Sequence, residues 1–98
     1  MRLNIGVIFG GKSVEHEISI ISAIEAMSHI DENKYKVVPI YIDKDNVWYT
    51  GMHLKSILHY RDIALVKRYA KKVSLVRRGN SFILESQGFL KKNICVID

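Results

Sequence analysis

The sequence has one cysteine, one proline and no apolar run long enough to cross a bilayer. A lone Cys95 cannot form an internal disulfide and cannot supply a cysteine cluster for a metal, which fits a reducing compartment. We expect Cys95 to lie in a buried strand. Because no apolar segment of signal-peptide length precedes the first strand pattern, we expect a cytoplasmic chain with no membrane association.

Acidic residues are also fewer than basic residues, and the formal net charge is +5. No aromatic ladder, zinc finger or glycine-rich RNA motif accompanies the excess of basic residues, so we interpret them as a solvated face. Nucleic acid is the lesser alternative, and we expect no nucleic-acid partner. The basic residues that crowd one segment are Lys67, Arg68, Lys71, Lys72, Arg77 and Arg78.

The length of 98 residues and the hydrophobic content of 48% suit one small folded domain, residues 1–98. This is short for an enzyme with two substrates. A strand pattern at 94–98 has nothing after it, so we expect a fragment of a longer protein.

Two strands and a helix are predicted in the first half. Leu3 to Phe9 is a nearly continuous apolar run, which favours a strand buried on both faces, inside a parallel sheet. A helix at 14–30 and a β-branched strand at 35–42 complete a βαβ unit. Pro39 cannot donate to a ladder, which places the second strand at an edge or a bulge. The apolar stripe of the helix is Ile18, Ile21, Ala23, Ile24, Met27 and Ile30.

The second half predicts smaller elements. Val47 to Tyr49 is a short returning strand with Trp48 covering the core, and residues 51–72 hold one or two short helices. Residues 72–85 form a hairpin with an exposed basic tip. Residues 87–90 are a connection, and 94–98 begin a buried strand. The predicted class is α/β, a mainly parallel sheet flanked by helices, plus the hairpin.

The glycine-rich turn between the first strand and the helix has two interpretations. Residues 6–13 match the P-loop expression G-x-x-x-x-G-K-S. A P-loop would require residues 7–9 to leave the core and wrap phosphate, so we reject it. Instead, Ser13 can cap the helix, and Glu15 and Glu17 suit the positive end of its dipole.

A family resemblance gives the second interpretation. Residues 7–19, Val-Ile-Phe-Gly-Gly-Lys-Ser-Val-Glu-His-Glu-Ile-Ser, with Ser22 and Ala23 after them, closely resemble the opening of the D-alanine:D-alanine ligase family. That family includes the D-alanine:D-serine and D-alanine:D-lactate ligases of vancomycin resistance. Residues 39–43, followed by Trp48 and Tyr49, look like its second strand. The resemblance covers the first fifty residues well and is weak from 52 to 90.

The resemblance implies a Rossmann-like N-terminal domain placed before an ATP-grasp core. In the full-length enzyme, a homodimer, that core would bind ATP and magnesium and phosphorylate the carboxylate of a first D-alanine. The amine of a second D-amino acid would then attack the acyl phosphate, making the peptidoglycan precursor. These later parts lie beyond Asp98, so we expect no cofactor, metal or activity in the fragment itself.

The resemblance also implies roles for two residues. Glu15 matches the glutamate that holds the ammonium of the first D-alanine, and is therefore the predicted catalytic and substrate-binding residue; Ile18 borders that substrate. The dipole interpretation is kept for Glu17. We interpret His16 as a surface residue, Lys12 as an exposed loop lysine, and assign no role to the other histidines. The alternative function is a stand-alone Rossmann-like binding or interaction module without catalysis.

Overall fold

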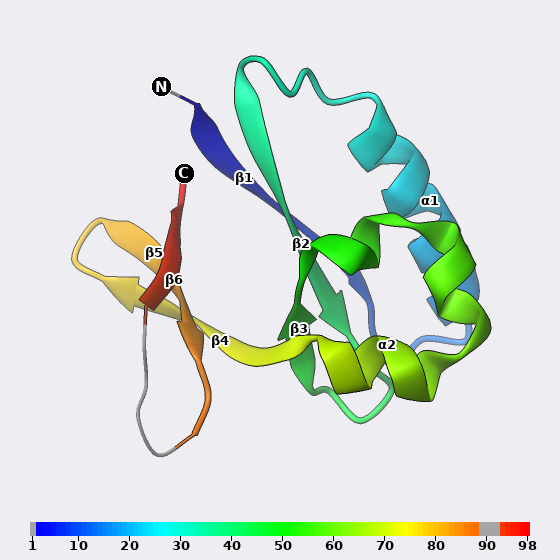
Figure 1. Cartoon of the computed structure of the whole chain (residues 1–98). Coiled ribbons are helices and arrows are strands. Elements are labelled where there is room, and N and C mark those ends of the chain that lie inside the picture. The colour runs from blue at the N-terminus through cyan, green and yellow to red at the C-terminus, as the bar shows by residue number, and fades with distance from the viewer. Residues whose placement is uncertain (1, 89–92) are drawn as a thin grey trace.

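The computed structural model describes residues 2–88 and 93–98, and its six strands form one sheet in the order of the sequence (Figure 1). Helices lie between the first two strands and between the third and fourth. The elements are β1 (Leu3–Gly10), α1 (His16–Ser28), β2 (Tyr35–Ile42), β3 (Trp48–Thr50), the 3₁₀ helices η1 (Met52–Lys55) and η2 (Ile57–Arg61), α2 (Ile63–Tyr69), β4 (Lys71–Arg78), β5 (Ser81–Ser86) and β6 (Asn93–Ile97).

The predicted βαβ unit is confirmed. β1 and β2 pair in parallel along their whole length, from Leu3 opposite Tyr35 to Gly10 opposite Ile42, with α1 connecting them. Every other pair of strands is antiparallel, so the expectation of a mainly parallel sheet is wrong. The reason lies in the connections: tight turns such as the one between β4 and β5 join antiparallel strands, whereas a parallel pair needs a long crossover.

The strand buried on both faces is β2, not β1. Val37 and Tyr41 belong to one apolar cluster and Val38 and Ile40 to another, and these pairs point to opposite faces of the strand. β1 begins the sheet, and its Ile8 is 50% exposed. The prediction that β1 lies inside the sheet, buried on both faces, is therefore wrong.

The prediction that β2 lies at an edge or a bulge is also wrong, because β2 sits between β1 and β3 and pairs with β1 in an unbroken register. Pro39 is tolerated for a local reason. β3 pairs only with Ile40 to Ile42, and the Pro39 carbonyl accepts a hydrogen bond from Thr50 Oγ1 at 2.7 Å. In a β-strand, the N–H and C=O groups of one residue point to the same side of the strand. The N–H group that Pro39 lacks would therefore point toward the start of the β3 ladder, and its absence removes no hydrogen bond to β1.

The core consists of two apolar clusters, one on each face of β2. The first packs α1, η1 and α2 against one face of the sheet, and the second packs β4 and β5 against the other face of β2 (Figure 1). Trp48 and Cys95 are only partly buried, against the second cluster. The strand at 94–98 is present as β6, but Ile94 and Val96 are substantially exposed, so it is not a buried strand. Residues 89 and 90 of the predicted 87–90 connection lie outside the described residues.

The burial of α1 differs from the predicted stripe. The helix begins at His16 rather than residue 14, and its buried residues are His16, Ile20, Ala23 and Met27, spaced by four, three and four positions. Ile18 and Ile21 are 61% and 57% exposed. The predicted helix is confirmed, but its buried face is rotated from the one predicted, and large apolar side chains also lie on its exposed side.

The hairpin of β4 and β5 is confirmed with its exposed basic tip. Arg78 at the tip pairs with Glu85 at 3.0 Å.

Lys67 does not belong to a solvated face, because it is partly buried and pairs with Asp43. β6, the last strand in the sheet order, also contacts β1, the first strand. The Asp98 N–H donates to the Asn4 carbonyl at 2.9 Å. No helix in the described part of the chain is long and apolar enough to cross a membrane.

Candidate functional site

The glycine loop, residues 10–15, joins β1 to α1 at the carboxyl ends of β1 and β2. Gly10 and Gly11 have φ of +93° and +96°, a backbone conformation that favours glycine. The Gly11 N–H donates to the Ile42 carbonyl at 2.8 Å, and the Gly10 N–H donates to Ser19 Oγ at 3.0 Å. Since Gly6 to Phe9 lie within β1 and pair with β2, no backbone there can wrap a phosphate, and the P-loop interpretation is excluded.

Glu15 stands at the end of the glycine loop, immediately before α1. Its N–H donates to Ser13 Oγ at 3.1 Å, so Ser13 restrains the residue before the helix rather than capping the helix itself. The Glu15 side chain is exposed and has no hydrogen-bond or ion-pair partner among residues 2–88 and 93–98. Ile18, also exposed, follows three positions later on the same helical face. Both predicted site residues are therefore exposed at the start of α1, three positions apart.

Glu17 differs from Glu15 in having a partner. It forms an exposed ion pair with Lys44 at 3.5 Å. A hydrogen bond from its own backbone N–H, and then the charge of Lys44, lower the pKa of Glu17. This local electrostatic role agrees with the helix-dipole interpretation of Glu17.

His16 is not a surface residue, contrary to the prediction. It is 3% exposed, with Nδ1 at 2.5 Å from the Gly11 carbonyl oxygen and Nε2 at 2.8 Å from the Tyr41 hydroxyl. Burial, helped by the nearby charge of Asp43, raises the pKa of Tyr41 to about 12, which keeps its hydroxyl protonated. The signal that could have found His16 is its spacing of four residues from Ile20, the next buried position of α1.

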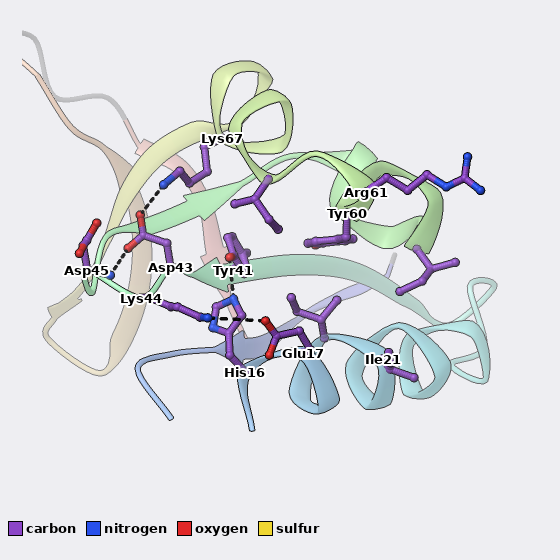
Figure 2. A pocket seen from close by; sticks show the side chains of 13 residues that line it. His16, Glu17, Ile21, Tyr41, Asp43, Lys44, Asp45, Tyr60, Arg61 and Lys67 are labelled. Carbon is purple, nitrogen blue, oxygen red and sulfur yellow. Dashed lines mark hydrogen bonds and ion pairs between the residues drawn. The ribbon is translucent and has the colours of Figure 1, made fainter. Parts of the chain in front are cut away.

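A cavity of about 540 Å³ lies beside His16, between α1, η2 and the turn after β2 (Figure 2). Tyr41 and Tyr60 contribute aromatic surface to it, with ring centroids 5.8 Å apart in an edge-to-face arrangement. Charged side chains from α1 and from the turn after β2 lie around it, among them the ion-paired Glu17 and Lys44. The cavity therefore offers apolar surface with a charged rim.

Asp43 organises the turn after β2. It is 3% exposed, and its Oδ1 accepts from the N–H group of Val47 at 2.9 Å. The same oxygen accepts from the N–H group of Asp45 at 2.8 Å, and Oδ2 accepts from Lys67 Nζ at 3.3 Å (Figure 2). Burial alone would raise the pKa of Asp43, but these donors outweigh it, and the pKa lies below its usual range.

Asp43→Asn is expected to destabilise the chain by about 2 kcal/mol at pH 7, because charge-assisted hydrogen bonds are lost in a buried site. The folded-state pKa is lower than the unfolded one. The contribution is thus complete above an unfolded pKa of about 4 and disappears as the pH falls through the folded value. Urea unfolding at pH 7 and pH 3 measures both effects. Asp45→Asn, at an exposed position, is the matched control; equal midpoints for the two variants at pH 7 would contradict the prediction.

No group of three or more histidine, cysteine, aspartate or glutamate side chains within 2–88 and 93–98 could hold a metal ion.

Residues 4–97 match the family model for the D-ala D-ala ligase N-terminus. The chain belongs to this family. The match extends through residues 52–90, where the resemblance in the sequence was weak.

Relatives of this ligase family agree in sequence and in fold. The chain is 45% identical over 92 residues to the D-alanine–D-alanine ligase of Thermosipho melanesiensis, covering 94% of this chain and 26% of the relative. The Coxiella burnetii D-alanine–D-alanine ligase structure has a TM-score of 0.72 at 28% identity, covering 94% of this chain and 26% of that one. The VanG D-Ala:D-Ser ligase from Enterococcus faecalis has a TM-score of 0.71 at 27% identity, covering 86% and 25%. The chain thus spans about a quarter of the length of these relatives.

Proposed function

We propose that this chain is the N-terminal, substrate-side domain of a longer ATP-dependent D-alanine–D-alanine or D-alanine–D-serine ligase, in which Glu15 binds the ammonium of the first D-alanine. The observation that carries the proposal is the unpaired carboxylate of Glu15 among the described residues, held at the end of the glycine loop beside the exposed Ile18. Family membership supports the reaction class.

The chemistry gives a carboxylate this role. An amino acid that reacts through its own carboxylate must present that group in one orientation, and a partner for its ammonium provides this. A carboxylate–ammonium pair forms charge-assisted hydrogen bonds, which are stronger and more directional than neutral ones. Ile18, one turn along the same face, can contact the methyl group of D-alanine. Glu15 binds and orients, and transfers no proton.

We assign no described residue of this chain to ATP or magnesium. The glycine loop lacks P-loop geometry, and the described residues hold no metal-ligand cluster. We therefore assign nucleotide and magnesium binding to the remainder of the longer protein, whose use of ATP also favours the cytoplasm. Peptidoglycan precursor synthesis and a homodimeric assembly are part of the same proposal.

The test is the longer protein assayed with ATP, magnesium and D-alanine, with D-alanine, D-serine or D-lactate as the second substrate. We expect phosphate release that requires D-alanine, with the dipeptide or depsipeptide identified by mass spectrometry. Phosphate release unaffected by any D-amino acid, or a gene that encodes no ATP-grasp region, would overturn the proposal. It would favour the alternative, a binding or interaction module without catalysis.

A further inference from the structure

We propose that His16 is a positioning residue, which ties the start of the glycine loop to its end and so sets the place of Glu15. The inference rests on the proposed function of Glu15 and adds a second residue to it. His16 touches no proposed substrate group itself; it acts through the backbone of the loop.

The first step is how the glycine loop is held. A Cβ built at Gly11 would meet no atom within 4 Å, so no side chain packs where one at this position would project. Gly11 is held through its backbone instead: its N–H donates to the Ile42 carbonyl at 2.8 Å, and its carbonyl oxygen lies 2.5 Å from His16 Nδ1. The first bond ties Gly11 to the sheet and the second ties it to α1.

The second step is the position of Glu15 relative to these bonds. Lys12, Ser13 and Val14 are exposed, and Val14 is 98% exposed, so the middle of the loop has little packing. Glu15 directly precedes His16, whose side chain reaches back to Gly11. The His16 to Gly11 bond therefore closes a small ring that includes Glu15. Losing it would remove the bond that ties Gly11 itself to α1, while Ser13 would still accept from the Glu15 and His16 N–H groups and Gly10 would still donate to Ser19.

The third step is the orientation of the His16 ring. A carbonyl oxygen can only accept, so Nδ1 carries the proton in this contact. In the neutral ring Nε2 is then an acceptor, and the Tyr41 hydroxyl donates to it at 2.8 Å (Figure 2). Tyr41 is 1% exposed and its ring meets the His16 ring edge-on, with centroids 5.4 Å apart. Tyr41 thus fixes the ring that fixes Gly11.

Two isosteric variants in the longer protein separate positioning from packing. His16→Asn places an amide nitrogen near Nδ1 and can keep the bond to the Gly11 carbonyl, while His16→Gln reaches toward Tyr41 and gives that bond up. We expect His16→Gln to raise KM for the first D-alanine about tenfold, the size of effect typical of one lost hydrogen bond. His16→Asn should stay within about twofold of the parent. KM for ATP should be unchanged in both.

A merely structural role would lower the melting temperature and the yield of active enzyme in both variants without separating their KM values for D-alanine. Equal KM values for the two variants would therefore overturn the inference. In the 98-residue chain labelled with ¹⁵N-histidine, we expect His16 in the Nδ1–H tautomer, and the Nε2–H tautomer would also overturn it. Glu15→Gln, measured alongside, separates the two proposals: if it is impaired while the His16 variants are equal, only the positioning role fails; if it is unimpaired, the role of Glu15 fails.

Discussion

Glu15→Gln in the longer protein is expected to lower kcat/KM for the first D-alanine by roughly 30-fold to several-thousand-fold, corresponding to about 2–5 kcal/mol. The substitution keeps the shape of the side chain and removes its charge. A substrate ammonium in a partly desolvated site would then face a neutral amide, which cannot form the charge-assisted pair. KM for ATP should change little, because nothing in this chain is assigned to the nucleotide.

The matched control is Glu17→Gln, at the same end of α1. Glu17 already pairs with Lys44 on the surface, so its loss should affect stability slightly and activity hardly at all. If Glu15 only complemented the helix dipole, Glu15→Gln would cost about 0.3–1 kcal/mol of stability and leave the kinetics nearly normal. Melting temperatures and steady-state kinetics on the same two variants distinguish these roles, and a near-normal kcat/KM for Glu15→Gln would end the substrate-binding proposal.

Gly10→Ala is expected to destabilise the chain by about 3 kcal/mol, the largest effect on stability that we predict. A Cβ at Gly10 would lie 2.3 Å from the Ile42 carbonyl oxygen, and φ is +93° there. The obstacle is backbone of the paired strand β2, so relief requires β1 and β2 to separate where they end. Urea unfolding monitored by circular dichroism gives the change in midpoint.

Gly11→Ala is the control for that experiment. Its φ of +96° carries similar conformational strain, but no atom lies within 4 Å of the added Cβ. We expect a cost of about 1 kcal/mol, from the backbone conformation alone. Similar losses in the two variants would mean that the approach of β1 to β2 at Gly10 is not what requires glycine.

Local patterns predicted the elements better than their arrangement. The β-branched run of β2 and the turn residues between β4 and β5 depend on neighbours in sequence, and both elements are present. Burial of Ile8 depends on how many strands lie beyond β1, which no local pattern encodes, and that prediction failed. Likewise, Pro39 alone predicts an edge or a bulge, although the partial length of β3 decides whether its missing donor matters.

The candidate site shows the same difference between what local sequence predicts and what depends on distant contacts. The proposed roles of Glu15 and Ile18 come from one contiguous motif and from helical spacing, which a sequence shows directly. The surface position predicted for His16 was wrong because its role depends on Tyr41, 25 positions away. The ion pair of Asp43 was likewise not predictable, because Lys67 is 24 positions from it. The four-residue spacing of His16 from Ile20 is a local sign of burial, but it does not reveal the partner of the ring. Only the fold supplies the Tyr41 hydroxyl that bonds to the histidine.

The pairing of Asn4 with Asp98 has a consequence for the order of folding. These residues are 94 positions apart, and besides the bond to the Asn4 carbonyl, the Asn4 N–H donates to Asp98 Oδ2 at 2.7 Å. Closing so long a loop before the intervening strands have paired would carry a large entropic cost and form almost no native structure in return. The β1–α1–β2 unit and the β4–β5 hairpin, each local in sequence, can form first. We therefore expect the contacts between β1 and β6 to form last during folding and to break first during unfolding.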